Sequence, residues 1–260
     1  MSENVLRAIF FDIDDTLFST SEFANRARRR AVEMMIQHGL RMDPEEALRE
    51  LGEVITEFTS NYPNHFDKLL LRIPETRYAG VNPALLVAAG VVGYHNTKKE
   101  LAAYPDAIEA LEILSRTDLI LGVITAGLEI KQAEKLIRLG IVRYLTPTAI
   151  FISDQIGISK PNIKLYRSAC AALGLDPRTV MYIGDNPRND IDPPNRLGMI
   201  TVRNLRGSRH AEDKGETEPR YQVRNFRELL DIIEKDFGIR LVRRRPRKPE
   251  VQMEQGELTV

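Results

Sequence analysis

Short apolar runs alternate with helical patterns over most of the chain. The first run, residues 8–11, is continuous, which is typical of a parallel strand covered on both faces. Four similar runs follow it, at residues 119–124, 149–152, 180–183 and 200–202. Apolar residues repeat at helical spacing in the segments between these runs and after the last one, over residues 107–114, 130–139, 163–173 and 226–237. This alternation predicts an α/β fold with a doubly wound, Rossmann-like parallel sheet.

Residues 18–103 break the alternation of strand and helix. Phe23, Ala27 and Ala31 repeat every four residues, and the sequence Asp-Pro-Glu-Glu at 43–46 is typical of a helix start. An insertion of this length exceeds a plain crossover connection. We therefore predict an inserted α-helical cap domain over 18–103 and a core domain made of residues 1–17 and 104–239. The cap follows the first strand and so lies over the carboxyl edge, where open α/β sheets bind ligands.

The charge of the chain limits its partners. The 260 residues contain 37 lysines and arginines against 37 acidic residues, so the formal net charge is zero. This balance argues against nucleic-acid binding by the protein as a whole. Residues 240–260 are first basic and then acidic, which predicts a solvated, disordered tail, and a nucleic acid or another anionic partner is expected only through that tail.

Neither a disulfide framework nor a membrane segment is expected. The chain has one cysteine, which excludes disulfide pairing within it and a zinc site built from cysteines. Acidic residues interrupt the apolar run at the N-terminus, unlike in a signal peptide. No stretch approaches the roughly 18 apolar residues of a membrane span. We expect a soluble, cytoplasmic protein with no membrane partner.

Acidic residues gather where two predicted strands end. Asp12, Asp14 and Asp15 follow the first strand, and Asp185 and Asp190 follow the fourth. In an extended chain residues two apart face the same side, so Asp12 and Asp14 can share a site while Asp15 points away. Several carboxylates at one edge repel one another unless a hard cation lies among them. Their oxygen ligands suggest Mg²⁺.

Groups suited to a phosphate follow two other parts of the sheet. Thr125, Ala126 and Gly127 come directly after the second strand and offer a hydroxyl and turn N–H groups. Lys160 precedes a proline and a new helix, and its ammonium group suits the same anion. A carboxylate that attacks a phosphate meets about 4 kcal/mol of repulsion per charge pair at roughly 4 Å. A metal on one side and Lys160 on the other would offset this repulsion.

These motifs together resemble the haloacid dehalogenase (HAD) superfamily. Its four motifs occur here in order: Asp12-x-Asp14-x-Thr16, then Thr125, then Lys160-Pro161, then Gly184-Asp185 with Asn189-Asp190. The inserted segment is similar to the helical C1 cap of its subfamily I. The segments 60–67 and 93–98, SNYPNHFD and GYHNTK, resemble archaeal members that act as glyceraldehyde 3-phosphate phosphatases.

The resemblance implies a role for each matching residue at the reacting phosphate. Asp12 is expected to be the nucleophile that forms an aspartyl-phosphate. Asp14 is expected to protonate the leaving oxygen and then to activate water. Thr125 and Lys160, with the turn at Ala126, are expected to hold the phosphoryl oxygens.

The resemblance also implies a Mg²⁺ site. Its expected ligands are Asp12, the backbone carbonyl of Asp14, Asp185 and Asp190, which is also expected to orient Lys160. The chain departs from the family pattern after this motif, where Asp192-Pro193-Pro194 replaces small residues. Since prolines can begin a helix but cannot lie inside one, we expect the local backbone to differ here.

The acid at Asp14 favours phosphate-monoester hydrolysis over dehalogenation, because halide leaves without a proton. A phosphomutase uses the same aspartyl-phosphate and stays an alternative. A binding protein without turnover is a weaker one, because Asp12, Asp14 and Lys160 are all present. A cap that closes over the site favours a small phosphorylated metabolite as substrate.

Overall fold

The computed structural model describes residues 5–207 and 210–242. Six parallel strands form one sheet in the order β3-β2-β1-β4-β5-β6. The strands are β1 (Ala8–Phe11), β2 (Ile120–Thr125), β3 (Ile150–Ile152), β4 (Val180–Gly184), β5 (Ile200–Asn204) and β6 (Tyr221–Val223). The chain runs outward from β1 to β3 and then returns to the other side of β1 as β4. The order therefore reverses between β1 and β4, which is where such sheets bind ligands.

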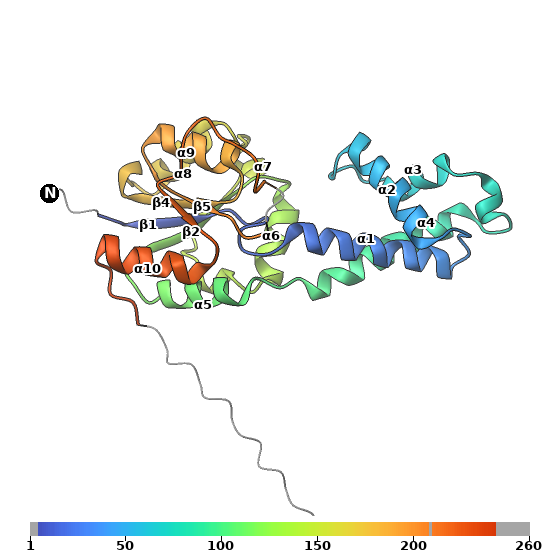
Figure 1. Cartoon of the computed structure of the whole chain (residues 1–260), viewed down its shortest axis with the longest axis horizontal. Coiled ribbons are helices and arrows are strands. Elements are labelled where there is room, and N and C mark those ends of the chain that lie inside the picture. Colours follow the sequence, from blue (N-terminus) through green and yellow to red (C-terminus); the bar gives the residue numbers. More distant parts are fainter. Residues whose placement is uncertain (1–4, 208–209, 243–260) are drawn as a thin grey trace, which may run out of the picture.

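Helices cover both faces of the sheet because β1 is apolar on both sides. Ile9 and Phe11 join a core with α5 (Pro105–Leu114), α6 (Glu129–Arg138) and α10 (Phe226–Phe237). Ala8 and Phe10 join a second core with α8 (Ile163–Ala172) on the opposite face. Figure 1 shows α8 and α9 (Asp192–Leu197) on one side of the sheet and α5 and α10 on the other.

Shorter elements complete the core. Short helix α7 follows β3 at Ser153–Ile156, and a π-helical turn at Pro187–Ile191 leads into α9. Single 3₁₀ turns lie at Val142–Tyr144 and Pro177–Thr179.

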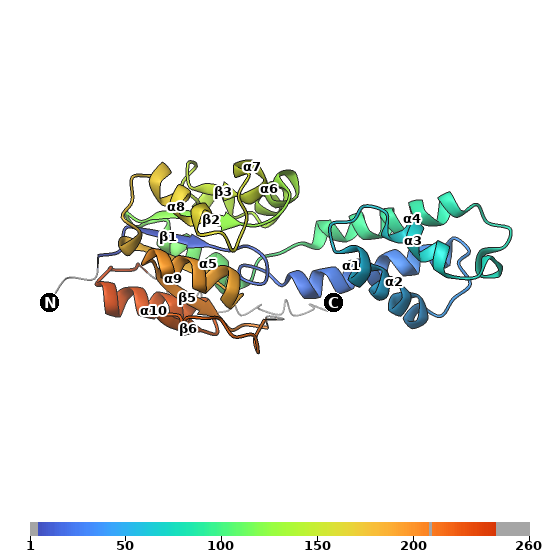
Figure 2. The ribbon, with the colours of Figure 1, turned by 90° about the horizontal axis from the view of Figure 1, so that it is seen from above.

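The helical segment 18–103 has a hydrophobic core of its own. It contains α1 (Thr20–Gln37), α2 (Pro44–Phe58), α3 (His65–Arg72), α4 (Pro83–Thr97) and 3₁₀ turns at Glu75–Tyr78 and Lys98–Glu100. Buried residues from all four helices pack together in it, among them Met35, Leu51, Leu69 and Leu86. Figures 1 and 2 show α1 and α4 running side by side away from the sheet. Gly93 permits this close approach, because a Cβ there would lie 2.6 Å from the carbonyl oxygen of Arg30.

Two connections join the helical segment to the core, one at each of its ends, and a hydrogen bond links these two connections. The Tyr104 N–H donates to the Leu17 carbonyl at 2.9 Å. Beside this junction, Lys98 at the end of α4 forms an ion pair with Glu134 on α6, with 2.8 Å between Nζ and Oε2. None of the helices within residues 5–207 and 210–242 combines the length and the apolar character needed to cross a membrane.

The predicted fold class is confirmed. The predicted strands and core helices agree with the structure to within two residues at each end, and α10 has the predicted bounds. The predicted sheet was incomplete, because β6 adds a sixth strand of only three residues. The two prolines at 193 and 194 lie in the first turn of α9, as their chemistry requires. Most of the predicted tail, residues 243–260, lies outside the described residues.

Candidate active site

The edge between β1 and β4 holds the first acidic residues of the candidate site. The backbone N–H of Asp12 donates to the Ile183 carbonyl at 2.8 Å, so the β1–β4 pairing extends to Asp12 itself. Asp185 directly follows β4 on the neighbouring strand. Asp12 and Asp185 are both buried.

Asp190 reaches the same place through the π-helical turn. Its N–H donates to the Asn186 carbonyl at 2.7 Å, and its Oδ2 accepts from the Asn186 N–H at 3.1 Å. A Cβ at Gly184 would lie 2.4 Å from the Cβ of Asp190, so a glycine is required for this approach. The side chain of Asp190 is buried as a result.

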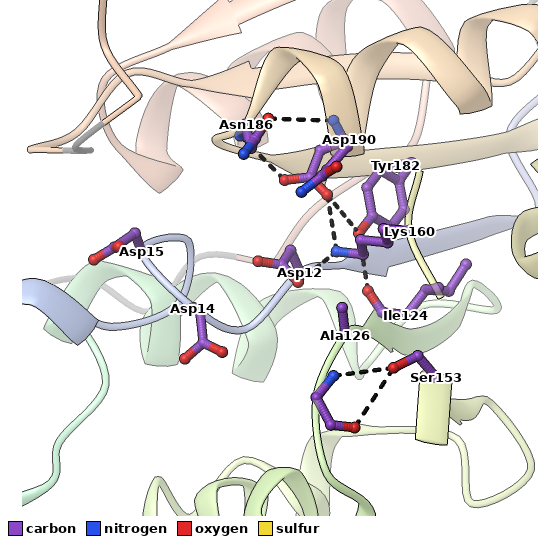
Figure 3. A network of polar contacts seen from close by, with 12 residues as sticks. Asp12, Asp14, Asp15, Ile124, Ala126, Ser153, Lys160, Tyr182, Asn186 and Asp190 are labelled. Atoms are coloured by element: carbon purple, nitrogen blue, oxygen red, sulfur yellow. Dashed lines mark hydrogen bonds and ion pairs between the residues drawn. The ribbon is translucent and has the colours of Figure 1, made fainter. Parts of the chain in front are cut away.

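Lys160 connects the two acidic parts of the site. Its Nζ lies 2.6 Å from Oδ1 of Asp12 and 2.8 Å from Oδ1 of Asp190 (Figure 3). The lysine side chain is only 4% exposed. Burial lowers the pKa of Lys160, but the charges of Asp12 and Asp190 outweigh burial and raise it well above its usual value. Lys160 therefore stays positively charged between two carboxylates.

Three carboxylates of the site are suited to a metal ion. One oxygen each of Asp12, Asp185 and Asp190 lies within 4.8 Å of the others. Burial raises the pKa of Asp12 to about 8; Asp190 and Asp14 add to the effect, and Lys160 opposes it. Three carboxyl groups thus lie together at this edge beside one ammonium group, that of Lys160. A small hard cation with oxygen ligands, such as Mg²⁺, fits this donor set.

The carboxylate of Asp14 lies outside this group. Figure 3 shows it on the other side of the loop from Asp12. Lys135 on α6 donates to both of its oxygens, at 2.5 and 2.7 Å, Gln132 donates at 3.1 Å, and Thr20 donates at 2.8 Å. Burial alone would raise the pKa of Asp14, but Lys135 and these hydrogen bonds lower it.

The loop that carries Asp14 turns after Ile13, and Asp14 lies within this turn. The N–H of Leu17 donates to the Ile13 carbonyl at 3.0 Å, so the chain turns directly after β1. Asp15, with a positive φ of 52°, accepts from the N–H groups of Thr20 and Ser21 at the start of α1. Asp15 therefore has a structural contact, away from the acidic group.

Thr125 and Ala126 lie where β2 ends, as the sequence predicts. Thr125 is fully buried, and its hydroxyl has no hydrogen-bond partner within the described residues. Ala126 is joined to the next helix, because its carbonyl accepts from Gln132 at 2.9 Å. The hydroxyl of Tyr182 donates to the Ile124 carbonyl at 2.9 Å and lies 3.3 Å from Oδ1 of Asp190. The end of β2 is thereby held beside the acidic group.

Three residues that support this site were not predicted from the sequence: Gln132, Lys135 and Tyr182. Gln132 and Lys135 lie three residues apart on α6 and so share a face of the helix. The sequence feature that could have indicated them was the position of that helix directly after Thr125. Tyr182 was read only as part of an apolar strand, although its hydroxyl is a polar group in a fully buried position.

Comparisons with known proteins agree with this geometry. Residues 6–198 match the family model of haloacid dehalogenase-like hydrolases. The chain is 44% identical to a glyceraldehyde 3-phosphate phosphatase of Methanopyrus kandleri, over 88% of this chain and 97% of that protein. It is 39% identical to the protein of the same name from Methanocaldococcus jannaschii, again over 88% and 97%.

The solved structure of a HAD phosphatase from Thermococcus onnurineus has the same fold. It matches with a TM-score of 0.61 at 21% identity and covers 88% of this chain and 98% of that one. The resemblance found in the sequence motifs is therefore confirmed by the family model, by curated relatives and by the fold. The chain belongs to the haloacid dehalogenase-like hydrolase family.

Proposed function

We propose that the protein hydrolyses a small phosphate monoester, with Mg²⁺ as cofactor, through an aspartyl-phosphate on Asp12. The observation that carries this proposal is the buried side chain of Lys160. It contacts Asp12 and Asp190, which together with Asp185 form the group of three carboxylates. A nucleophilic carboxylate, an anion-binding lysine and a cation site at one strand edge are the parts that phosphoryl transfer needs.

In the first step Asp12 attacks phosphorus. A bond forms between a carboxylate oxygen and phosphorus, and the ester P–O bond to the leaving group breaks. Asp12 is suited to this attack because β1 and the hydrogen bond to Ile183 fix its backbone. Lys160 and the Thr125 hydroxyl hold phosphoryl oxygens, with the turn at Ala126 beside them. The buried hydroxyl of Thr125, which has no partner within residues 5–207 and 210–242, supports this assignment.

Asp12, Asp185 and Asp190 would hold Mg²⁺ with the backbone carbonyl of Asp14. When bound, the ion supplies positive charge that offsets the repulsion between the carboxylates and the phosphate. Asp190 has a second role, because its contact with Lys160 orients the ammonium group.

Asp14 moves the protons. It gives a proton to the leaving oxygen in the first step, and its carboxylate then takes one from the water that attacks the aspartyl-phosphate. The contacts from Lys135, Gln132 and Thr20 match the ionised form that this second step requires. Thr20 begins α1, so Asp14 lies where the helical segment joins the core. We therefore expect the leaving group to bind between these two parts.

The substrate we propose is a triose phosphate, glyceraldehyde 3-phosphate. The support is the similarity to the two archaeal phosphatases of that name, which extends over nearly the whole of each relative and includes the helical segment. Our proposal has the helical segment contact the leaving group, so similarity there supports the choice of substrate.

A panel of monoesters tests the proposed function. We expect phosphate release from glyceraldehyde 3-phosphate and p-nitrophenyl phosphate with Mg²⁺ and none in EDTA, because the carboxylates then repel the substrate. Glyceraldehyde 3-phosphate should have the highest kcat/KM of a panel that includes other triose phosphates, hexose phosphates and nucleotides. No release from any ester would contradict the proposal, and phosphoryl exchange between sugar phosphates would indicate a mutase instead.

Asp185→Asn tests the cation site. Losing one charged ligand should raise the Mg²⁺ concentration for half-maximal activity by at least about tenfold. The measurement is phosphate release during a Mg²⁺ titration. Asp118→Asn is the matched control, because Asp118 is exposed at the opposite edge of the sheet, next to the start of β2. An unchanged Mg²⁺ requirement in Asp185→Asn would remove Asp185 from the site.

A further inference from the structure

The carboxylate of Asp14 is held by donors from two parts of the molecule. Lys135 Nζ lies 2.5 Å from Oδ1 and 2.7 Å from Oδ2, so one ammonium group spans both oxygens. Gln132 adds a bond to Oδ2 and Thr20 a bond to Oδ1. Gln132 and Lys135 belong to the core helix α6, whereas Thr20 belongs to α1 of the helical segment.

Helix α6 is well placed to fix Asp14. It follows the turn at Ala126, and the buried side chain of Gln132 bonds both the Ala126 carbonyl and Asp14. Lys135 lies one turn further along, and its Nζ is 5.8 Å from the centre of the Phe18 ring. The loop after β1, the end of β2 and Asp14 are therefore tied to one helix.

The neighbouring Glu134 does not compete for Lys135. Its Oε2 pairs with Lys98 at 2.8 Å and its Oε1 with Arg138 at 2.8 Å. Lys135 instead pairs with Asp14, and its side chain is 25% exposed. Lys135 thus turns from the helix surface toward a half-buried carboxylate on another element.

We infer that Lys135 is a positioning residue for Asp14, which fixes the carboxyl group in the orientation that serves the leaving oxygen. This inference rests on the proposed function, in which Asp14 gives the leaving group its proton. Thr20 and Gln132 each contact one oxygen of Asp14, whereas the ammonium group contacts both at short distance and carries the charge that holds the carboxylate in place.

Substrates whose leaving groups differ in their need for a proton distinguish this role from a merely structural one. In the first step the Asp12–phosphorus bond forms, the ester P–O bond breaks, and an alkoxide leaving oxygen takes a proton that Asp14 has bound from solvent. Asp14 then returns to the ionised form that Lys135 contacts. The p-nitrophenolate ion departs without a proton. The placement of Asp14 therefore matters for alkyl phosphates and has little effect on kcat/KM for p-nitrophenyl phosphate.

The test compares kcat/KM of Lys135→Met for glyceraldehyde 3-phosphate and p-nitrophenyl phosphate. We expect kcat/KM to fall by about 10- to 100-fold for glyceraldehyde 3-phosphate, the alkyl ester, which is part of the full contribution of a positioned acid. For p-nitrophenyl phosphate, the aryl ester, kcat/KM should fall by less than about threefold. Lys135→Arg should recover most of the alkyl activity. Lys131→Met is the matched control, because Lys131 is an exposed lysine of the same helix.

Equal losses for the two esters would overturn the inference, and so would an unchanged alkyl activity. If Lys135→Met were poorly folded by urea denaturation, Lys135→Gln would take its place in the same comparison. Failure of the wild-type protein to release phosphate from either ester would instead contradict the proposed function. The two failures are thus distinguishable.

A double-mutant cycle tests whether Lys135 acts through Asp14. In an Asp14→Asn background, Lys135→Met should cause no further loss of alkyl-ester activity, because the group that Lys135 positions is already gone. Effects of the two substitutions that multiply would show that Lys135 acts by another route and would overturn the inference.

Discussion

Asp12→Asn is expected to abolish turnover while leaving the protein folded. An amide does not form the aspartyl-phosphate, so kcat should fall by about 10⁴-fold or more, as when other catalytic nucleophiles are removed. The asparagine side chain has nearly the same shape, and the Asp12 N–H bond to Ile183 does not depend on the side chain. Phosphate release and the far-UV circular dichroism of the variant measure the two halves of this expectation.

The same substitution has an expected effect on stability. Folding raises the pKa of Asp12 from 3.8 to about 8, chiefly through burial, so the folded protein binds a proton that the unfolded chain releases. The free energy of unfolding of the metal-free protein should therefore fall as the pH rises from about 4 to about 8. Asp12→Asn should lose this part of the pH dependence, as measured by urea denaturation in EDTA.

Asp118→Asn serves as the control for both measurements, because that exposed carboxylate lies at the opposite edge of the sheet. Full phosphatase activity in Asp12→Asn would contradict the assignment of the nucleophile. A pH dependence identical to that of the wild type would instead contradict the described environment of Asp12.

Lys160→Met is expected to impair both stability and activity. The ammonium group contacts two buried carboxylates, and removing one partner of such a buried ion pair costs about 3–5 kcal/mol of unfolding free energy. Losing a charged donor to the phosphate should also lower kcat/KM by about 10²–10³-fold. Urea denaturation in EDTA measures the first effect, and phosphate release with Mg²⁺ measures the second.

Mg²⁺ should restore part of the stability that Lys160→Met loses, because a cation among Asp12, Asp185 and Asp190 offsets the same negative charge. Lys164→Met is the matched control, since Lys164 is an exposed lysine on the following helix, α8. A variant as stable as the wild type in EDTA would show that Lys160 does not hold the two carboxylates together.

Much of the core could be predicted because its strands are apolar on both faces. The run that forms β1 has no polar residue, and its four side chains are completely buried. The strand β6 was not predictable in this way, because its middle residue, Gln222, is exposed and only three residues pair with β5. An edge strand of this length gives no periodicity to detect.

The arrangement of the acids could be predicted only in part. Asp12 and Asp185 follow adjacent parallel strands, so the sheet alone brings them to one edge. The position of Asp14 depends on a turn at Ile13–Leu17 and on Lys135, which is more than a hundred residues away in the chain. No local pattern encodes an ion pair between two elements that tertiary packing brings together.

Trapping the aspartyl-phosphate on Asp12 would test the proposed mechanism directly. The protein would be mixed with p-nitrophenyl phosphate and Mg²⁺, quenched in acid during turnover and digested for peptide mass spectrometry. We expect one added phosphoryl group on the peptide that carries Asp12, absent in EDTA and in Asp12→Asn. Continued phosphate release with that peptide unmodified and a phosphoryl group on another residue would contradict this mechanism.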